Sequence, residues 1–432
     1  MARKRQSEKV EPTGNVRIDL AREIGFTPIG DSKYSSIQDF IPTFIPQLDK
    51  ILGGGIPFGR ISEIFSPEAV GKSTMVIYLT RIATMLGVDC LWIDTEGTSD
   101  PERMEELGVD TDAVSVFEPK TENGENMNVE TVQAAVEAVI NKYNTDEYRD
   151  RPVLVIWDSV GGTVTKAEQD VEAGDTIQRG RQAAAVTALV RKVTPMIKDI
   201  NMAFVVINQV RDNQNMMNKF DTKYTRPGGR ALDHAESLRL ELRRSTQIKG
   251  RNGDEKEDSK VGHYINVITD KSKITRPKQS TKVILAAGWE IPETKDPTYG
   301  ATPLIADGID YEYNIYNSAV DLGIIKASGA YKKYIDPDTG EVINLYELDW
   351  LRRLKQDKEL RQRLAIANTA AVFPKAKPAY MNNKHIDVHS WDEVAPIADY
   401  FDSRPDSTEP KPVLETETPV QETPDEQQTD NK

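Results

Sequence analysis

The segment at residues 60–74 constrains the fold of this chain more than any other. It reads RISEIFSPEAVGKST, an apolar strand followed by a short loop and the beginning of a helix. Backbone N–H groups at the beginning of a helix point toward an anion, and a loop that lets several of them converge forms a concave phosphate site. Lys72 can reach the β- and γ-phosphates, and the Ser73 hydroxyl can join the coordination shell of Mg²⁺. The segment therefore predicts a nucleoside triphosphate site.

One position departs from the usual pattern for such a loop, G-x-x-x-x-G-K-[ST]. Ser66 replaces the first glycine, so a residue with a Cβ atom has to make the turn there. Gly71 is retained and permits close approach of the phosphates. The residues that we expect around the phosphates are Ser66, Pro67, Glu68, Ala69, Val70, Gly71, Lys72, Ser73 and Thr74.

Length, apolar runs and charge limit the class of protein. The 432 residues can form one large core and a smaller second unit. No apolar run approaches the ~20 residues of a membrane span, and no apolar signal segment follows the charged first residues, so we expect a cytoplasmic protein without membrane association. The single Cys90 excludes a disulfide framework. The net charge of -14 argues against nucleic-acid binding by the whole surface, but a local basic groove is compatible with it.

Short apolar runs alternate with longer amphipathic ones from about residue 60 to 288. This alternation is typical of an α/β fold with a mostly parallel sheet covered by helices on both faces. The sequence suggests four parts, which are an N-terminal segment with a short helix (1–40), the α/β core (41–290), a small α+β domain (291–375) and a Pro-rich, acidic, disordered tail (376–432). We expect the N-terminal helix to contact a neighbouring copy of the chain.

Carboxylates follow two of the predicted strands. Asp158 ends the apolar run 153–158, where a carboxylate can orient the water shell of Mg²⁺ opposite Ser73; the alternative is an aspartate that only caps the next turn. Glu96 follows the strand at 88–94 and can polarise the water that attacks a γ-phosphate. The alternative for Glu96 is a solvated charge at a strand end, and Asp94 is the competing candidate for its role.

Two segments with weak secondary-structure signals, 161–179 and 211–229, leave the sheet at the ends of later strands. Ligands of open α/β sheets bind beyond these carboxyl ends, so both segments should lie at the functional edge. Gln209 ends the strand before the second segment, and its amide could report the presence of a γ-phosphate to that segment. The alternative is a polar residue that is satisfied locally at a strand end.

Both segments carry cations, and glycines at the end of the second give the backbone freedom. Such clusters suit a polyanion held through its backbone, although an ordinary solvated loop has a similar composition. The cations are Lys166, Arg179, Arg181 and Arg191 near the first segment, and Arg211, Lys219, Lys223, Arg226 and Arg230 in and after the second. The four histidines have no metal-binding spacing, and we interpret them as structural.

An ordered set of motifs in residues 41–335 resembles the RecA recombinase family, in particular bacteriophage members of the RecA/UvsX type. The motifs are GGIPFGRISEI (54–64), PE (67–68), GK (71–72), IDTE (93–96), DP (100–101), LGVD (107–110), DSV (158–160), KAE (166–168), GD (174–175), INQVR (207–211), GGRAL (228–232), KSK (271–273), VDLG (320–323) and GAY (329–331). As a set they are far more specific than the phosphate loop alone.

The resemblance implies a RecA-type P-loop ATPase that uses ATP and Mg²⁺, forms a homo-oligomeric helical filament on single-stranded DNA and exchanges strands with duplex DNA in recombination and repair. It implies that Glu96 activates water, Gln209 senses the γ-phosphate, and Lys271 and Lys273 reach the ATP of the neighbouring subunit. Single-strand-binding and mediator proteins are further expected partners. The implied residues are Asp100 and Arg103 at adenine, Ser73 and Asp158 at the metal, and Arg179, Gly180, Arg191, Arg211, Gly228, Gly229 and Arg230 at DNA.

Three positions differ from the family pattern. Besides Ser66, Arg103 stands where bacterial members usually stack a tyrosine on adenine, and Asp212 lies in a loop that is normally apolar. Two other functions stay open, namely a ring helicase or other DNA-dependent motor on the same core and a non-enzymatic DNA-binding or loader protein. Lys271 and Lys273 disfavour the helicase, while the intact Lys72, Glu96 and Asp158 disfavour the non-enzymatic protein.

Overall fold

A computed structural model describes residues 14–24, 37, 39–97, 99–120, 126–170, 180–212, 224–250, 259–290 and 304–403. Its centre is an eight-stranded sheet within these ranges. Across the sheet the strands are β12 (Ser280–Ala286), β11 (Ser259–Ser272), β10 (Leu238–Gly250), β3 (Arg60–Ser66), β7 (Met202–Gln209), β6 (Val153–Asp158), β4 (Asp89–Asp94) and β5 (Val114–Phe117). β10, β3, β7, β6, β4 and β5 pair in parallel, and β11 and β12 extend the sheet antiparallel. The predicted α/β class and mostly parallel sheet are confirmed.

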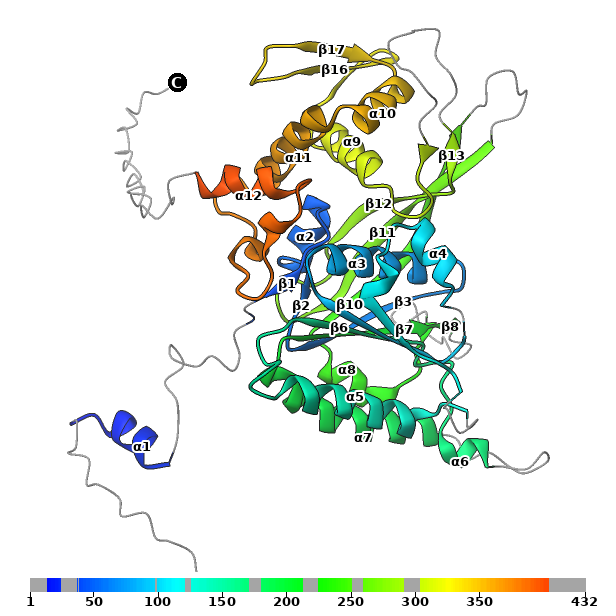
Figure 1. Ribbon diagram of the computed structural model, residues 1–432, viewed down its shortest axis with the longest axis vertical. Helices are drawn as coiled ribbons and strands as arrows, with labels where there is room; N and C mark the ends of the chain where they lie inside the picture. Colours follow the sequence, from blue (N-terminus) through cyan, green and yellow to red (C-terminus); the bar gives the residue numbers. More distant parts are fainter. Residues whose placement is uncertain are drawn as a thin grey trace, which may run out of the picture.

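Helices cover both faces of this sheet (Figure 1). The helices α5 (Val129–Tyr143), α7 (Arg181–Met196) and α8 (Gly229–Ala235) lie on one face, and α3 (Lys72–Met85) and α4 (Pro101–Glu106) lie on the other. The short α6 (Lys166–Gln169) precedes α7. Every residue of β6 is buried, as expected for a parallel strand with helices on both sides.

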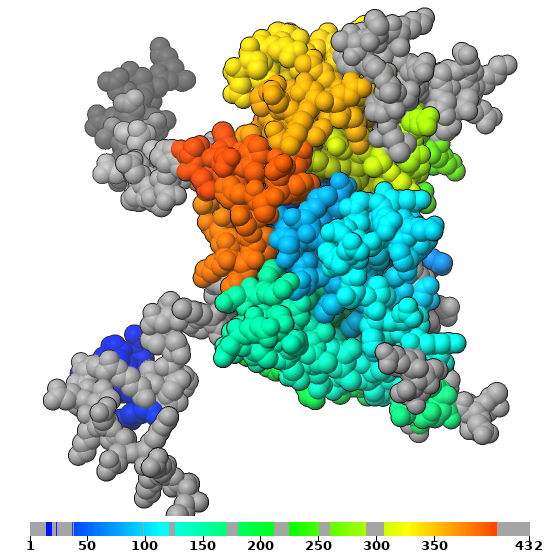
Figure 2. Space-filling view, viewed as in Figure 1, coloured from blue at the N-terminus to red at the C-terminus, as the bar shows by residue number. Residues whose placement is uncertain are grey.

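The two faces carry separate hydrophobic clusters. In the first cluster, Val132, Val136 and Val193 of α5 and α7 pack with residues of β6 and β7 such as Val155 and Phe204. The other continues from α3 into the C-terminal region, so that Trp350 and Leu364 belong to the same cluster as Val76. The C-terminal helices therefore pack directly on the sheet domain, where α2 (Pro46–Leu52) contacts α11 (Lys358–Val372). In Figure 2 the C-terminal region lies directly against the blue N-terminal part of the core.

The C-terminal region is a mixed α+β unit, as predicted. Its helices are α9 (Tyr311–Asp321), α10 (Glu347–Gln356), α11 (Lys358–Val372) and α12 (Ala395–Asp402). Its strands β15 (Lys326–Ser328), β16 (Tyr331–Ile335) and β17 (Val342–Leu345) form a small antiparallel sheet. The remaining elements are α1 (Val16–Ile24) and the short strands β1 (Phe40–Ile41), β2 (Ile56–Pro57), β8 (Arg211–Asp212), β9 (Tyr224–Thr225), β13 (Trp289–Glu290) and β14 (Leu304–Ile305). The predicted N-terminal helix at 15–24 is confirmed.

The prediction that a disordered tail begins at residue 376 was wrong for residues 376–403. This stretch returns from the C-terminal unit to the sheet domain, where Tyr380 is buried against Phe44 at a ring-centroid distance of 5.6 Å. Ile397 and Phe401 of α12 are buried in the same cluster. Enough apolar side chains lie between the prolines to offset the entropy of ordering the backbone. The acidic residues from 404 onward lie outside the described ranges.

Polar contacts fix this return segment to the beginning of the core. The buried Asp39 carboxylate accepts hydrogen bonds from the backbone N–H groups of Lys384 (2.8 Å) and His385 (2.7 Å). The Asn383 side chain accepts from the Phe40 N–H (3.0 Å) and donates to the Phe40 carbonyl (2.8 Å). Residues more than 340 positions apart are thus joined side by side. Within the described residues, no helix has the length and apolar character that crossing a membrane requires.

Replacing Asp39 by alanine should lower the free energy of unfolding by about 1–3 kcal/mol, because two backbone N–H groups lose their acceptor. Urea unfolding monitored by tryptophan fluorescence measures this change. Asp392→Ala, at an exposed position of the same segment, is the matched control and should have little effect. Equal unfolding midpoints for Asp39→Ala and the control would contradict a stabilising role of the Asp39 hydrogen bonds to Lys384 and His385.

Candidate functional site

A cavity of about 290 Å³ lies at the carboxyl edge of the parallel strands. It brings together residues from the phosphate loop, the beginning of α3 and the ends of three strands. The lining residues are Glu68, Ala69, Gly71, Lys72, Ser73, Thr74, Glu96, Asp158 and Gln209. The candidate residues that the sequence placed on separate strands therefore meet around one space.

The turn of the phosphate loop is made by residues later than Ser66. Ser66 is still part of β3 and fully buried, whereas Ala69 and Gly71 have positive φ angles of 56° and 113°. The backbone angle of Gly71 favours glycine, and the Leu285 side chain would have to move to admit a Cβ atom, which would lie 2.5 Å from its Cδ1. The expectation that a residue with a Cβ atom must make the turn at position 66 was therefore wrong.

Lys72 folds back over the loop. Its ammonium group donates to the carbonyl oxygens of Pro67 (2.9 Å) and Ser66 (3.2 Å) and to Ser66 Oγ (3.2 Å). Burial lowers the pKa of Lys72, and the negative charges of Asp158, Glu96 and Glu68 oppose that shift. The serine at position 66 thus gives the lysine one additional acceptor that glycine would lack.

Asp158 faces the same cavity from the end of β6. Burial, followed by repulsion from Glu96 and Asp94, raises the pKa of Asp158 to about 7, although Lys72 acts in the opposite direction. A carboxylate oxygen and the Ser73 hydroxyl are hard ligands of the kind that Mg²⁺ prefers. Among the described residues no cluster of three or more His, Cys, Asp or Glu side chains is arranged to hold a metal. This donor set fits Mg²⁺, which usually keeps several waters and takes its other ligands from phosphate oxygens.

The geometry distinguishes Glu96 from Asp94. The Asp94 carboxylate accepts hydrogen bonds from the backbone N–H groups of Glu96 (3.0 Å), Gly97 (2.8 Å) and Ser99 (2.7 Å), so it shapes the turn after β4. Glu96 lines the cavity and is exposed to it. Of the two carboxylates, only Glu96 is placed to act on a bound water.

Ser159, which was not predicted as a site residue, contacts the Glu96 carboxylate and holds it toward the cavity. Its hydroxyl donates to Glu96 Oε1 and accepts from the Gly162 N–H at 3.1 Å. A Cβ atom on Gly162 would lie 2.7 Å from Glu96 Oε1, so this glycine leaves room for the carboxylate. The adjacent Thr95 hydroxyl donates to the Asp158 carbonyl at 3.1 Å. The DSV motif at 158–160 and the glycines after it were the available signal.

The other implied nucleotide contacts lie outside the cavity. The Asp100 side chain accepts from the Glu102 N–H at 3.0 Å and caps α4, as its position before Pro101 predicts. The Arg103 guanidinium is engaged by Glu106 (3.2 Å) and by Asp307. Contacts of Asp100 and Arg103 with adenine stay predictions.

Lys271 and Lys273 are held by α8 instead of lining the cavity. Lys271 donates to the Asp233 carbonyl, and Lys273 donates to the His234 carbonyl at 2.8 Å. These carbonyls end α8, where the helix dipole favours a cation. Within one subunit, the two lysines are thus separate from the phosphate loop.

The ends of the two predicted DNA-binding segments lie side by side. Gly180 precedes α7 and Gly228 precedes α8, both with positive φ angles, and a Cβ atom on Gly229 would lie 3.0 Å from Cβ of Ala183 in the first turn of α7. Arg230 is exposed at this junction. The glycines thus permit the two helix beginnings to approach closely.

The other predicted DNA contacts either lie away from this junction or are described only in part. Arg191 is exposed on α7 but eleven residues beyond Gly180, about 16 Å along the helix. Arg211 is described only through its backbone, in β8, and Arg179 lies outside the described residues, as do Lys219 and Lys223. The structure therefore brings together the glycines and Arg230 but leaves Arg191 apart.

Comparison with known proteins identifies the family. The family model for the RecA N-terminal domain matches residues 23–290. The RecA protein of Ruminococcus albus is 33% identical over 314 residues, which are 72% of this chain and 68% of the relative. That of Heliobacterium modesticaldum is 32% identical over 307 residues, 71% of this chain and 77% of the relative. The RecA protein of Aquifex pyrophilus is 32% identical over 302 residues, 70% of this chain and 75% of the relative.

This chain belongs to the RecA recombinase family. It is an ATP-dependent recombination and repair protein and a DNA-dependent ATPase that uses ATP and Mg²⁺. RecA-family proteins bind DNA and form filaments. The match ends at residue 290, where the antiparallel extension of the sheet gives way to the C-terminal unit.

The raised pKa of Asp158 predicts a pH dependence of stability in the protein without nucleotide and Mg²⁺. Between about pH 4 and 7 the folded protein keeps a proton on Asp158 that the unfolded chain releases, so this group makes stability fall as the pH rises, by at most about 1.4 kcal/mol per unit. Asp158→Asn should lack this fall. Urea midpoints from pH 4.5 to 8 in EDTA measure the difference, and parallel pH profiles for the two proteins would show that Asp158 has an ordinary pKa.

Proposed function

We propose that the cavity at the edge of the sheet binds the triphosphate of ATP and that its hydrolysis controls the grip of the segments 161–179 and 211–229 on DNA. One observation carries this proposal. The phosphate loop, Glu96, Asp158 and Gln209 come from four different strand ends and line a single space. Gln209 is also the last residue of β7, directly before the second segment.

The phosphate loop positions the substrate. Backbone N–H groups of residues 68–74 would surround the α- and β-phosphates, and the Lys72 ammonium would leave its carbonyl acceptors for the β- and γ-phosphates. The Ser73 hydroxyl and the Asp158 carboxylate, which line the same cavity, would hold Mg²⁺. Mg²⁺ supplies neutralisation of the charge that develops on the phosphate oxygens.

Glu96 is proposed as the general base. Water attacks the γ-phosphorus, its proton passes to the Glu96 carboxylate, and the bond from the γ-phosphorus to the bridging oxygen breaks to release ADP and phosphate. The Ser159 hydroxyl restricts the Glu96 side chain to an orientation toward the cavity. The carboxylate is thus positioned before the substrate binds.

Gln209 is proposed to sense the γ-phosphate. Its amide can donate to a γ-phosphate oxygen and accept from the attacking water. The loss of that oxygen after hydrolysis would change the position of the strand end and of the segment that follows. The contacts with single-stranded and double-stranded DNA are assigned to Gly228, Gly229 and Arg230 with Arg179, Gly180, Arg191 and Arg211.

Assembly into a helical filament is proposed to complete the site. Lys271 and Lys273 would leave the carbonyls of α8 to reach the ATP of an adjacent subunit, and α1 would dock on a neighbour. Binding of single-strand-binding and mediator proteins, the division at residues 40, 290 and 375, a bacteriophage RecA/UvsX-type origin and a cytoplasmic location belong to the same proposal. A ring helicase is the alternative, and electron micrographs of closed hexameric rings on DNA would favour it.

Lys72→Ala should lower DNA-stimulated ATP turnover at least 100-fold, because Lys72 is the only cation among the described residues that line the cavity. A phosphate-release assay with and without single-stranded DNA measures this loss. Lys50→Ala, at an exposed lysine of α2, is the matched control and should keep full turnover. Full turnover in Lys72→Ala would reject the cavity as the ATPase site, and no turnover in the unmodified protein would favour a non-enzymatic role.

A further inference from the structure

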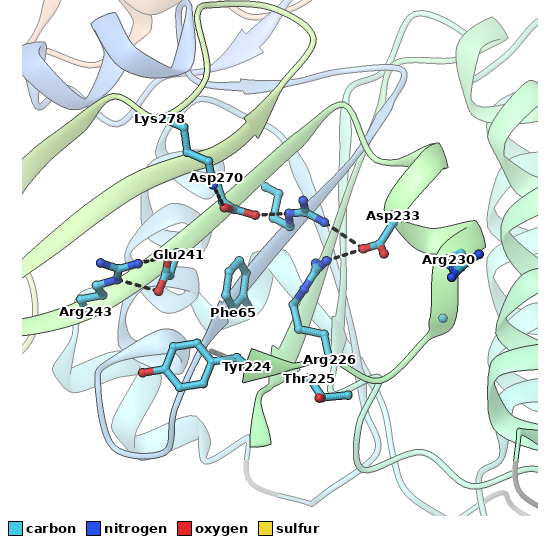
Figure 3. A pocket seen from close by; sticks show the side chains of 12 residues that line it. Phe65, Tyr224, Thr225, Arg226, Arg230, Asp233, Glu241, Arg243, Asp270 and Lys278 are labelled. Carbon is cyan, nitrogen blue, oxygen red and sulfur yellow. Dashed lines mark hydrogen bonds and ion pairs between the residues drawn. The ribbon is translucent and has the colours of Figure 1, made fainter. Parts of the chain in front are cut away.

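A second cavity, of about 500 Å³, lies beside the end of the second DNA segment (Figure 3). Arginines line much of it, but most of them are neutralised by carboxylates. Arg226 contacts Asp233, Arg239 pairs with Asp270 at 2.6 Å, and Arg243 pairs with Glu241. The side chains around this cavity thus form an internal ion-pair network and do not form a free anion site.

Arg226 is the member of this network that reaches the ATPase strand. One branch of its guanidinium contacts the Glu63 carboxylate, the other contacts Asp233, and the group lies over the Phe65 ring at 5.1 Å. The Arg226 side chain is only 16% exposed and Glu63 is 0% exposed. The interpretation of Arg226 as a cation that extends toward a polyanion was therefore wrong, whereas Arg230 is exposed and stays a predicted DNA contact.

Glu63 stands three residues before Ser66 in β3, the strand that leads into the phosphate loop. Its carboxylate also accepts from Asn208 Nδ2 at 2.8 Å. The same Asn208 amide donates to the Pro227 carbonyl at 2.9 Å, and Asn208 directly precedes Gln209 in β7. The Asn208 amide thus links three elements by buried hydrogen bonds. They are β3, which leads into the phosphate loop, β7, which carries the proposed sensor, and the end of the second DNA segment.

The two ends of that segment are also joined to each other. Arg211 and Asp212 of β8 pair antiparallel with Thr225 and Tyr224 of β9, and Arg226 follows β9 directly. A displacement at Gln209 would therefore move β8 and, through the strand pairing, β9. Arg226, which follows β9, is held to β3 by its contact with Glu63. A shift of the Arg226 end of the segment relative to β3 would strain or break the contact between Arg226 and Glu63.

The surroundings of Glu63 make this contact costly to lose. Glu236 is fully buried near it, and burial followed by repulsion from Glu63 raises the pKa of Glu236 to about 10. Arg239 lies 2.7 Å from Glu236, whereas the cation in contact with Glu63 is Arg226. Without Arg226, the buried Glu63 carboxylate would keep the Asn208 amide as a partner but lose the cation that contacts it.

We propose that Arg226 is a positioning residue whose ion pair with the buried Glu63 transmits the nucleotide state of the phosphate-loop strand to the second DNA segment. This inference rests on the proposed function, because it assumes that this segment holds DNA. It assigns to Arg226 the coupling between the two sites, whereas Arg230 supplies affinity through the DNA backbone.

The test compares the affinity for a fluorescent single-stranded oligonucleotide in ADP with that in a non-hydrolysable ATP analogue, by anisotropy. In the unmodified protein the ratio of the two dissociation constants should be at least tenfold. Arg226→Gln should bring the ratio below threefold. Arg230→Gln removes the same charge four residues later and should weaken binding in both nucleotides while leaving the ratio unchanged.

A ratio in Arg226→Gln equal to that of the unmodified protein would overturn the inference. A ratio near one in the unmodified protein would instead defeat the proposed function, so the two failures can be distinguished. If Arg226→Gln does not fold, the double variant Glu63→Gln with Arg226→Gln removes both buried charges and should fold with a ratio below threefold. A folded double variant with the full ratio, or a double variant as unstable as the single one, would contradict the role of the ion pair.

Discussion

Lys72 and Asp158 are both buried and line the same cavity at the edge of the sheet. The opposite charges of these two side chains determine what the cavity can bind. Burial lowers the pKa of the lysine and raises that of the aspartate to about 7, so both charges are held at a cost. Occupants with complementary charges relieve that cost, namely phosphate oxygens at the ammonium group and a hard cation at the carboxylate. The chemistry of MgATP satisfies both requirements at once.

The parallel sheet explains why these groups meet. Strands that run in the same direction end at the same edge, so β3, β4, β6 and β7 deliver the phosphate loop, Glu96, Asp158 and Gln209 to one place. The segments that leave this edge return as α7 and α8, whose first turns are in contact through Gly229 and Ala183. The same edge therefore carries the proposed ATPase residues and the ends of both predicted DNA-binding segments. The contacts around Glu63 connect the phosphate-loop strand with the end of the second segment.

Much of this arrangement was predictable from local sequence. The phosphate loop, the strand ends at Asp158 and Gln209, and the helix that Asp100 caps all follow from patterns of fewer than ten residues. The choice between Asp94 and Glu96 did not follow, because it depends on which carboxylate the backbone N–H groups of the turn consume. The inward direction of Arg226 was also hidden, since its partner Glu63 is 163 residues away and reads locally as an ordinary strand residue.

The segment at 376–403 shows a different limit. Its prolines and charges have the composition of a tail, yet the apolar side chains between them find a surface on α2 and β1 that the sequence does not reveal. Asp39, which the sequence placed at the end of the N-terminal segment 1–40, provides the polar contact. Long-range docking of short apolar motifs depends on the shape of the completed core, and no periodicity within the segment indicates it.

The most direct test of the central claim is a single-turnover measurement on Glu96→Gln at saturating ATP, Mg²⁺ and single-stranded DNA, with nucleotide affinity determined on the same sample. The account predicts that ATP affinity stays within a few-fold of the unmodified protein while the hydrolysis rate falls by about 100-fold or more, because only the proton acceptor is removed. Hydrolysis at the unmodified rate would contradict the placement of the general base at Glu96 and with it the assignment of the cavity.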